Sequence, residues 1–311
     1  MALTPPSAPL PPYLHWWERG WLSANNVLCI GAHGATLVDS GYCSHAAQTV
    51  ALVRHTLGQA PLTTLLNTHL HSDHCGGNAA LQAAFPQLHT RIPAGPWIHV
   101  QTWDAHALSY LPTGQDCPRF HADSTLAPGD CVVLGDTPWQ VHAAPGHDPH
   151  AVLLWEPQAR LLISGDALWA DGFGVVFPEI EGVHAFEEVA QTLDLIESLQ
   201  PAVVLPGHGP LFTDVATALA TARRRLDGFV HAPRKHATYA AKVLLKFKLM
   251  QWQQQPLAQV LQWIAQTPYL QTLHRQHFAE QDSPQWSQAL VQSLVNSGAA
   301  RLHEGQLYNA G

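Results

Sequence analysis

Residues 67–77, Asn-Thr-His-Leu-His-Ser-Asp-His-Cys-Gly-Gly, place four coordinating side chains within six positions: His69, His71, Asp73 and His74. They directly follow the short apolar run LTTLL, which is typical of a buried strand. One such cluster could bind a single ion, and ligands from other segments would complete a larger site. The stretch therefore constrains the fold, because it predicts a strand edge at which several parts of the chain meet.

Backbone geometry decides which of these side chains point the same way. In extended backbone alternate side chains share a face, so His69, His71 and Asp73 would lie on one side of the chain. His74 breaks the alternation and needs a turn, which the Gly-Gly pair that follows permits. A helix would separate residues 69, 71 and 73, so we expect the cluster in a loop at the edge of a strand.

Three further candidate ligands occur downstream, each where a predicted strand runs out into Gly or Asp. His147 ends the segment APGH, Asp166 lies in SGDALW, and His208 lies in LPGHG. Because the chain contains 21 histidines, any one of them is weak evidence for a site. Seven candidate ligands at successive strand ends are stronger evidence.

The hydrophobic pattern predicts mixed strands and helices. Apolar or β-branched runs bounded by Gly, Pro and Asp predict strands within residues 25–41, 62–70, 131–136, 139–147, 151–157, 160–168 and 202–209. Helical spacing predicts helices within 45–57, 78–85, 184–199, 216–230, 238–253, 257–266 and 283–298, before a hairpin over 299–308. The mixture lacks strict alternation, so we predict an α/β (α+β) fold of sheet and helix layers rather than one doubly wound sheet.

Charge divides the 311 residues into two regions. Five Lys/Arg and nineteen Asp/Glu precede residue 223, a net charge of −14, whereas ten Lys/Arg and four Asp/Glu follow, a net charge of +6. We predict an irregular, Pro-rich N-terminal arm over 1–19, a catalytic domain over 20–222 and a C-terminal helical domain over 223–311. The helices and final hairpin of the last region resemble a winged helix.

Composition and the remaining sequence limit the class of protein. With 46% hydrophobic and 12% charged residues, the chain is globular rather than disordered. Five scattered cysteines without a C-x-x-C pair argue for a reducing compartment. No segment approaches the ~20 apolar residues of a membrane span, and the start lacks a basic, apolar leader. We expect a cytoplasmic protein that does not contact membranes; its oligomeric state stays open.

The ligand motifs resemble those of the metallo-β-lactamase superfamily. H-x-H-x-D-H at 69–74 and single ligands at His147, Asp166 and His208 occur in that family's order, over roughly residues 20–215. Asp39 closes an early strand, as the family's first motif does. The resemblance implies a metallo-hydrolase with an αββα sandwich, followed here by the C-terminal helical, winged-helix-like domain.

The resemblance also implies which residues bind two metal ions. His69, His71 and His147 would hold one zinc ion, Asp73, His74 and His208 the other, and Asp166 would bridge them. Zn²⁺ suits imidazole nitrogen and carboxylate oxygen, and iron or manganese suits the same ligands. Zinc lowers the pKa of bound water to about 7, so a bridging hydroxide would be the nucleophile.

Two aspartates have further roles under this resemblance. Asp73, oriented toward the nucleophile, would relay its proton and so act as a catalytic residue. Asp39 would accept a hydrogen bond from a ligand imidazole and fix its tautomer. The alternative for Asp39 is an ordinary turn residue in the sequence DSG.

The charge of such a site, formally about +1, favours an anionic substrate. The stretch SGDALWADGFG resembles that of glyoxalase II more than that of a nuclease, whereas the final Pro-Gly-His-Gly departs from the ending of true glyoxalase II. We therefore predict hydrolysis of an ester, thioester or lactone of a small anionic metabolite. Trp169, Phe173 and Phe177 would line an apolar substrate pocket or pack in the core, and residues 103–123 would cover the site or form a surface loop.

Two alternative functions stay open. The basic residues from 223 onward, among them Lys242 and Lys246, would form a solvated face or, as the resemblance to glyoxalase II implies, bind acidic groups of a small substrate. In a phosphodiesterase or endoribonuclease of the same superfamily they would instead hold RNA phosphates. The charge of −14 on the catalytic half disfavours such a polyanion. A metal-dependent nucleic-acid-binding regulator would not need the complete ligand set. A small-molecule substrate is therefore the first choice.

Overall fold

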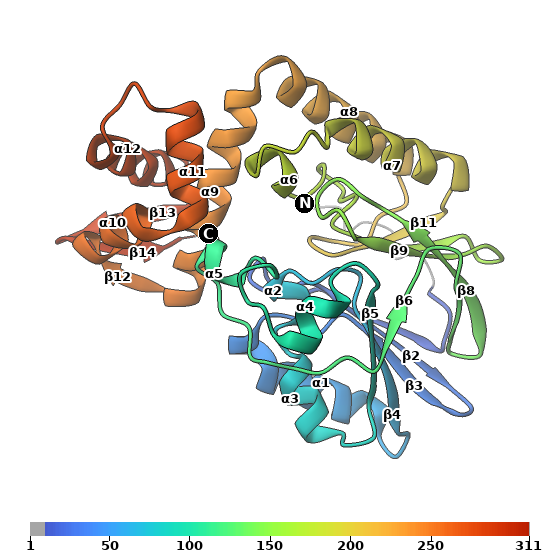
Figure 1. The fold of residues 1–311 in the computed structure, drawn as a ribbon. Helices are drawn as coiled ribbons and strands as arrows, with labels where there is room; N and C mark the ends of the chain where they lie inside the picture. The colour runs from blue at the N-terminus through green and yellow to red at the C-terminus, as the bar shows by residue number, and fades with distance from the viewer. Residues whose placement is uncertain (1–9, 311) are drawn as a thin grey trace, which may run out of the picture.

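In the computed structural model, which describes residues 10–310, two β-sheets pack against each other (Figure 1). The six-stranded sheet runs in the order β1 Leu14–Trp17, β2 Asn26–Gly31, β3 Gly34–Val38, β4 Leu62–Leu66, β5 His89–Pro93 and β6 Ser124–Leu126. The five-stranded sheet runs in the order β11 Val203–Pro206, β10 Leu161–Gly165, β9 Val152–Glu156, β8 Thr137–Ala143 and β7 Cys131–Leu134.

Helices cover the outer face of each sheet. The six-stranded sheet packs on α1 Ala46–Leu57 and α3 Asn78–Ala84, and the five-stranded sheet packs on α7 Phe186–Leu199 and α8 Val215–His231. Alternation along β10 explains the layering, since Leu161 and Ile163 enter the core between the sheets while Leu162 joins the core under α7 and α8. The predicted αββα sandwich is thereby confirmed.

Short helical segments occupy the connections between these layers. They are the 3₁₀ helix Cys43–His45, α2 Ser72–Cys75, α4 Trp97–Thr102, α5 Tyr110–Thr113 and α6 Phe177–Ile180. Of these, α5 and α6 contact the C-terminal helices. They therefore lie where the sandwich meets the C-terminal region.

The C-terminal region is helical with a small sheet. It comprises α9 Pro233–Trp252, β12 Gln254–Pro256, α10 Leu257–Gln266, α11 Pro268–His277, α12 Ser283–Asn296, β13 Ala300–His303 and β14 Gln306–Asn309. The predicted hairpin is present, and β12 adds a third strand to it in the order β12-β14-β13. Figure 1 shows this orange and red region beside the sandwich, with α9 nearest to it. The winged-helix comparison stays a prediction.

The structure bears on two predicted domain boundaries, the end of the N-terminal arm and the start of the C-terminal domain. Residues 1–9 of the predicted irregular arm are outside the described range, and Leu14–Trp17 of that arm form a strand, β1, which pairs antiparallel with β2. The helix α8 continues through the predicted boundary at residue 223 and packs against α7. The domain division stays a prediction. Within residues 10–310 no helix combines the length and apolar character needed to cross a membrane.

Candidate metal centre

The seven predicted ligands come together at one edge of the sandwich because each follows a strand. Residues 69–74 follow β4, and His147, Asp166 and His208 follow β8, β10 and β11. β8 and β10 are both antiparallel to β9, and β10 is parallel to β11, so these three strands end on the same edge. Sheet topology thus gathers side chains that are up to 139 positions apart in the sequence, from His69 to His208.

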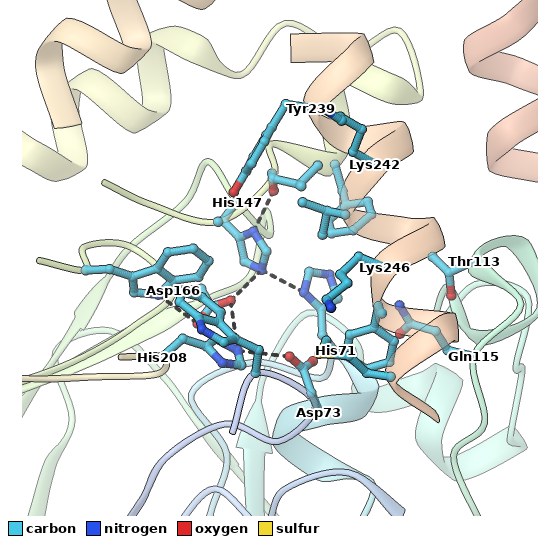
Figure 2. Close-up of a pocket in the computed structure, with 18 of the residues that line it drawn as sticks. His71, Asp73, Thr113, Gln115, His147, Asp166, His208, Tyr239, Lys242 and Lys246 are labelled. Atoms are coloured by element: carbon cyan, nitrogen blue, oxygen red, sulfur yellow. Dashed lines mark hydrogen bonds and ion pairs between the residues drawn. The ribbon is translucent and has the colours of Figure 1, made fainter. Parts of the chain in front are cut away.

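The ligand atoms form two adjacent groups. His69, His71 and His147 make one group, and Asp73, His74, Asp166 and His208 the other, with the ligand atoms of each group within 4.8 Å of one another. In the first, Nδ1 of His71 lies 2.8 Å from Nε2 of His147. In the second, Nε2 of His208 lies 3.0 Å from Oδ2 of Asp73 (Figure 2).

Asp166 stands between the two groups. Its Oδ2 lies 3.4 Å from Nε2 of His147, and its Oδ1 lies 3.3 Å from Nε2 of His74. Trp169 donates a hydrogen bond from its indole Nε1 to the same Oδ1 at 3.2 Å. The carboxylate therefore faces both groups and is held in orientation by a neighbouring indole.

The local backbone differs from the predicted extended loop. His71 is extended, with φ −65° and ψ 149°, but Ser72–Cys75 form one helical turn. This turn begins one residue before Asp73. It places the Asp73 carboxylate with His74, Asp166 and His208, whereas His69 and His71 belong to the group that contains His147. The predicted alternation through Asp73 is therefore wrong, because the backbone leaves the extended conformation at Ser72.

The Gly-Gly pair has a different role from the predicted one. Gly76 has φ −61° and Gly77 has φ −83°, values that any residue adopts. A Cβ on Gly76 would lie 2.4 Å from the carbonyl oxygen of Ser72, and one on Gly77 would lie 2.4 Å from that of Ser40. These glycines are needed because neighbouring backbone approaches closely, not because the turn requires a left-handed conformation.

Two buried ring nitrogens in the cluster lack a hydrogen-bond partner. His69 is 1% exposed and His74 is 0% exposed, and Nε2 of each makes no hydrogen bond among residues 10–310, although Nε2 of His74 lies 3.3 Å from Oδ1 of Asp166. A buried polar atom without a partner destabilises the fold by roughly 1–3 kcal/mol, and such atoms are rare in native proteins. A metal ion would satisfy both nitrogens, so the donor set and its geometry fit a metal.

Asp39 contacts one of these histidines, and its expected role in fixing a ligand tautomer stays a prediction. Its Oδ2 lies 2.8 Å from Nδ1 of His74, and it also accepts hydrogen bonds from the backbone N–H and the hydroxyl of Thr68. Nδ1 of His74 is thereby engaged, and Nε2 is left to face Asp166. Asp39 has φ 58°, a left-handed conformation that aspartate tolerates better than most residues.

Two further glycines leave room for the cluster. A Cβ on Gly207 would lie 2.3 Å from Oδ1 of Asp166, and one on Gly174 would lie 2.3 Å from Nδ1 of His147. Both distances are far below van der Waals contact. The Pro-Gly-His-Gly sequence is thus explained in part by the approach of Asp166 to the backbone of Gly207.

Electrostatics in the metal-free cluster separate the anionic side chains from the neutral ones. Burial lowers the pKa of His147 to about 4, with a contribution from the nearby His71, and burial likewise lowers that of His69 well below its usual value. Burial opposes the charge of Asp166, but His208 and His74 outweigh it and hold the pKa of its carboxyl well below the usual range. Burial opposes the charge of His74, but Asp166 and Asp39 outweigh it and hold the pKa of this imidazole well above its usual value. The neutral imidazoles of His69 and His147 beside these carboxylates are donors of the kind that a divalent cation requires.

A cavity of about 390 Å³ opens beside the cluster. Trp169 and Phe177 line it as predicted, whereas Phe173 is 1% exposed and packs in the core under α7 and α8. Thr113 and Gln115 of the segment 103–123 contribute to its wall. Of the two alternatives for this segment, a cover of the site or a surface loop, the position of these two side chains favours the first.

Two further elements contribute to the cavity, and only the first was not foreseen from the sequence. Trp21, before β2, lies parallel to the ring of His208, with ring centroids 5.3 Å apart and planes at 6°. Tyr239, Lys242 and Lys246 enter from α9, as Figure 2 shows. Lys242 and Lys246 belong to the basic region for which substrate binding was one of the open interpretations, and the spacing of these residues along one helix gives them a shared face.

Comparison with known proteins agrees with this geometry. A model of the metallo-beta-lactamase superfamily matches residues 19–208. A hydroxyacylglutathione hydrolase from Rhodospirillum rubrum is 31% identical over 131 residues, which cover 42% of this chain and 43% of that protein. One from Rhodobacter capsulatus is 34% identical over 145 residues, covering 46% and 47%. The matches thus span less than half the length of these curated relatives.

Solved structures extend the likeness of fold. A metallo-beta-lactamase family protein from Thermus thermophilus has a TM-score of 0.54 at 18% identity, over 96% of this chain and 99% of that chain. A protein solved in a di-iron-bound form has a TM-score of 0.53 at 26% identity, over 67% of this chain and 96% of that chain. The first of these shows likeness of fold along almost the whole described chain.

Proposed function

Because the chain belongs to the metallo-beta-lactamase superfamily, we propose that it is a hydrolase that uses two metal ions, zinc in the first place, on an ester, thioester or lactone of a small anionic metabolite. The observation that supports this most is the convergence of seven donor side chains, among which the buried Nε2 atoms of His69 and His74 make no hydrogen bond within residues 10–310. A structural role alone would not leave these nitrogens unsatisfied.

The proposed ligand sets follow the two groups of side chains. His69, His71 and His147 would hold one ion, Asp73, His74 and His208 the second, and Asp166 would bridge them. When bound, the ions would make water nucleophilic near neutral pH and polarise the carbonyl of the substrate. Iron would suit the same donors, as the similar di-iron-bound protein illustrates.

The side chains of this protein would position the reaction and move the proton. His208 and Trp169 flank the carboxylates of Asp73 and Asp166, and the pKa of Asp73 is lowered by His74 and His208 despite its burial. Asp73 is thus ionised near neutral pH, and as a carboxylate it would relay the proton of the nucleophile. Asp39 would fix the tautomer of His74 through the contact at Nδ1.

Thioesters are supported by the curated relatives, which are hydroxyacylglutathione hydrolases. A nucleic-acid substrate is less well supported than a thioester, because several basic side chains after residue 222 are already paired with carboxylates. Arg223 pairs with Asp194 and Glu197, Arg234 pairs with Glu280, and Lys248 lies 3.6 Å from Asp116. Lysines and arginines already paired with carboxylates contribute little to phosphate binding. The phosphodiesterase or endoribonuclease therefore stays the second candidate function, and the nucleic-acid-binding regulator the third.

The test is metal analysis followed by a substrate panel. Protein purified under metal-replete conditions should contain close to two transition-metal ions per chain, and protein treated with a chelator should lose both its metal and its activity. The panel compares thioesters, esters and lactones with phosphodiesters and RNA. Turnover of RNA alone would favour the ribonuclease, and a protein without metal would exclude the proposed mechanism. The cytoplasmic location stays a prediction from the sequence.

A further inference from the structure

Two different sets of side chains line the cavity beside the candidate metal centre. One set is the polar cluster itself, with His71, Asp73, His147, Asp166 and His208. The other set comes from α9, which contributes Tyr239, Lys242, Val243, Lys246, Phe247 and Met250. A substrate whose scissile bond reaches the cluster would therefore extend along α9, and the chemistry of that wall selects what it carries.

Most of the remaining cavity wall is apolar. Trp21, Trp169 and Phe177 surround the cluster, and Val243, Phe247 and Leu294 continue the surface toward the C-terminal helices. Trp21 is 55% exposed, which is unusual for so large an apolar side chain and places its ring at the rim. A surface of this kind binds methylene groups or rings and offers few partners to the amides of a peptide.

Three polar side chains of the wall, apart from Tyr239 and the lysines, already make hydrogen bonds within the protein. Thr113 donates to the carbonyl oxygen of Ser109 at 2.7 Å, and Gln115 accepts from the hydroxyl of Ser72 at 2.5 Å. Ser297 donates to the carbonyl oxygen of Leu294 at 2.9 Å. These three groups are partly satisfied within the protein, so they contribute less to ligand binding.

The two lysines of the wall differ in whether their ammonium groups have partners within the protein. Nζ of Lys246 donates to Ala299 O at 2.8 Å, to Asn309 Oδ1 at 2.6 Å and to Ala310 O at 2.7 Å. Its three N–H groups are thus all used in attaching α9 to the end of the chain. Lys242, one helical turn earlier on α9, has no hydrogen-bond or ion-pair partner within residues 10–310. It is half-buried, so its charge is left for a ligand.

We propose that the substrate has an apolar chain or ring between the bond that is hydrolysed and a single anionic group, and that Lys242 binds that group. The inference rests on the proposed hydrolytic function for the position of the scissile bond. The proposed substrate differs from a glutathione thioester, whose tripeptide would bring two amides and two carboxylates to a wall with one free lysine among the described residues.

Binding of non-hydrolysable probes tests the proposal without turnover. The probes are methylthio-octanoate, its amide and S-methylglutathione, titrated into metal-loaded protein while tryptophan fluorescence is followed, since Trp21 and Trp169 line the cavity. Methylthio-octanoate should bind more tightly than the other two. Affinity should fall about twofold to fourfold for each methylene removed from the chain.

Variants then locate the anionic group. Lys242→Met should weaken binding of methylthio-octanoate about tenfold or more, and Lys242→Arg should retain it. The amide should bind Lys242→Met and the wild-type protein alike. Lys235→Met, an exposed lysine on the same helix outside the cavity lining, is the matched control and should leave affinity unchanged.

Two results would overturn the proposal: equal binding of methylthio-octanoate by the wild-type protein and Lys242→Met, or tighter binding of S-methylglutathione. A carboxylate held by the metal ions instead of Lys242 would give the first result. If probe binding depends on Lys242 but no ester, thioester or lactone is hydrolysed, the anion site stands and the proposed function fails. If hydrolysis occurs without that dependence, only the substrate inference fails.

Discussion

Nδ1 of His74 lies 2.8 Å from Oδ2 of Asp39, an aspartate 35 positions earlier in the chain, and both side chains are buried. Asp39 reaches this position from a left-handed backbone conformation at the end of β3. The contact engages one ring nitrogen and leaves the other facing the cluster. It therefore links the strand end to the orientation of one proposed metal ligand.

Replacement of Asp39 by Asn tests this link, because Asn tolerates the same backbone conformation but removes the charge. We expect metal affinity to fall about 10–100-fold, measured by competition with a chromophoric chelator. Asp136→Asn is the control, since Asp136 also has a positive φ of 66° and binds the backbone N–H of Ala32 away from the cluster. Equal metal affinity in Asp39→Asn and the wild-type protein would contradict the proposed role.

Asp73→Ala tests the proposed ligand and proton acceptor. Oδ2 of Asp73 lies 3.0 Å from Nε2 of His208, and its removal leaves that histidine without a carboxylate partner at this distance. We expect kcat to fall at least ~10³-fold while the thermal midpoint of the metal-free protein changes little. Wild-type turnover on the thioester and ester panel would remove Asp73 from the mechanism. The exposed carboxylate of Asp171 offers a control, Asp171→Ala.

The position of the candidate ligands followed from sequence because strand ends carry them. Apolar runs before His147, Asp166 and His208 marked β8, β10 and β11. Because these strands end at the same edge of one sheet, the three side chains that follow them lie close together. The helical turn at Ser72 was missed because four residues are too few for helical periodicity to show. β1 was missed because its pairing with β2 overrides a Pro-rich, irregular context.

Side-chain contacts across the chain explain what sequence could not distinguish. Lys242 and Lys246 are equivalent by spacing on α9, yet only Lys246 is fixed by the end of the chain. Phe173 and Phe177 lie four positions apart in a segment predicted to line a pocket or pack in the core, and only Phe177 lines the cavity. Each difference depends on partners more than 50 positions away, as between Lys246 and Ala299 or between Phe173 and Phe229.

Gly207→Ala tests the close approach of backbone and carboxylate. The added Cβ would lie 2.3 Å from Oδ1 of Asp166 and 2.9 Å from Cε1 of His74, so one or both side chains must move. We expect loss of at least one metal ion per chain, measured by elemental analysis after dialysis. Gly228→Ala in α8 is the matched control, because nothing lies within 4 Å of its Cβ. It should retain metal and raise stability by about 0.5–1 kcal/mol; full metal content in Gly207→Ala would contradict the argument.

His236 predicts a pH dependence of stability that is separate from the metal cluster. The side chain is buried on α9, and its Nε2 accepts a hydrogen bond from the backbone N–H of Val176 at 3.1 Å. The rings of Phe186 and Phe229 pack against it. Burial, with a contribution from His277, lowers the pKa of His236 to about 4 from 6.5. The folded protein therefore holds this imidazole neutral where the unfolded chain would protonate it.

The sign of the effect follows from that difference in pKa. The stabilisation is fully present above pH 6.5 and is lost as the pH falls from 6.5 toward 4, because the unfolded state binds the proton first. Between pH 8 and pH 5 the free energy of unfolding should fall by ~2 kcal/mol through this residue. Chemical denaturation at both pH values should show that loss in the wild-type protein and lack it in His236→Gln. His231→Gln, at an exposed histidine of α8, should retain the wild-type dependence. An identical dependence in wild-type protein and His236→Gln would show that His236 is not the group that titrates.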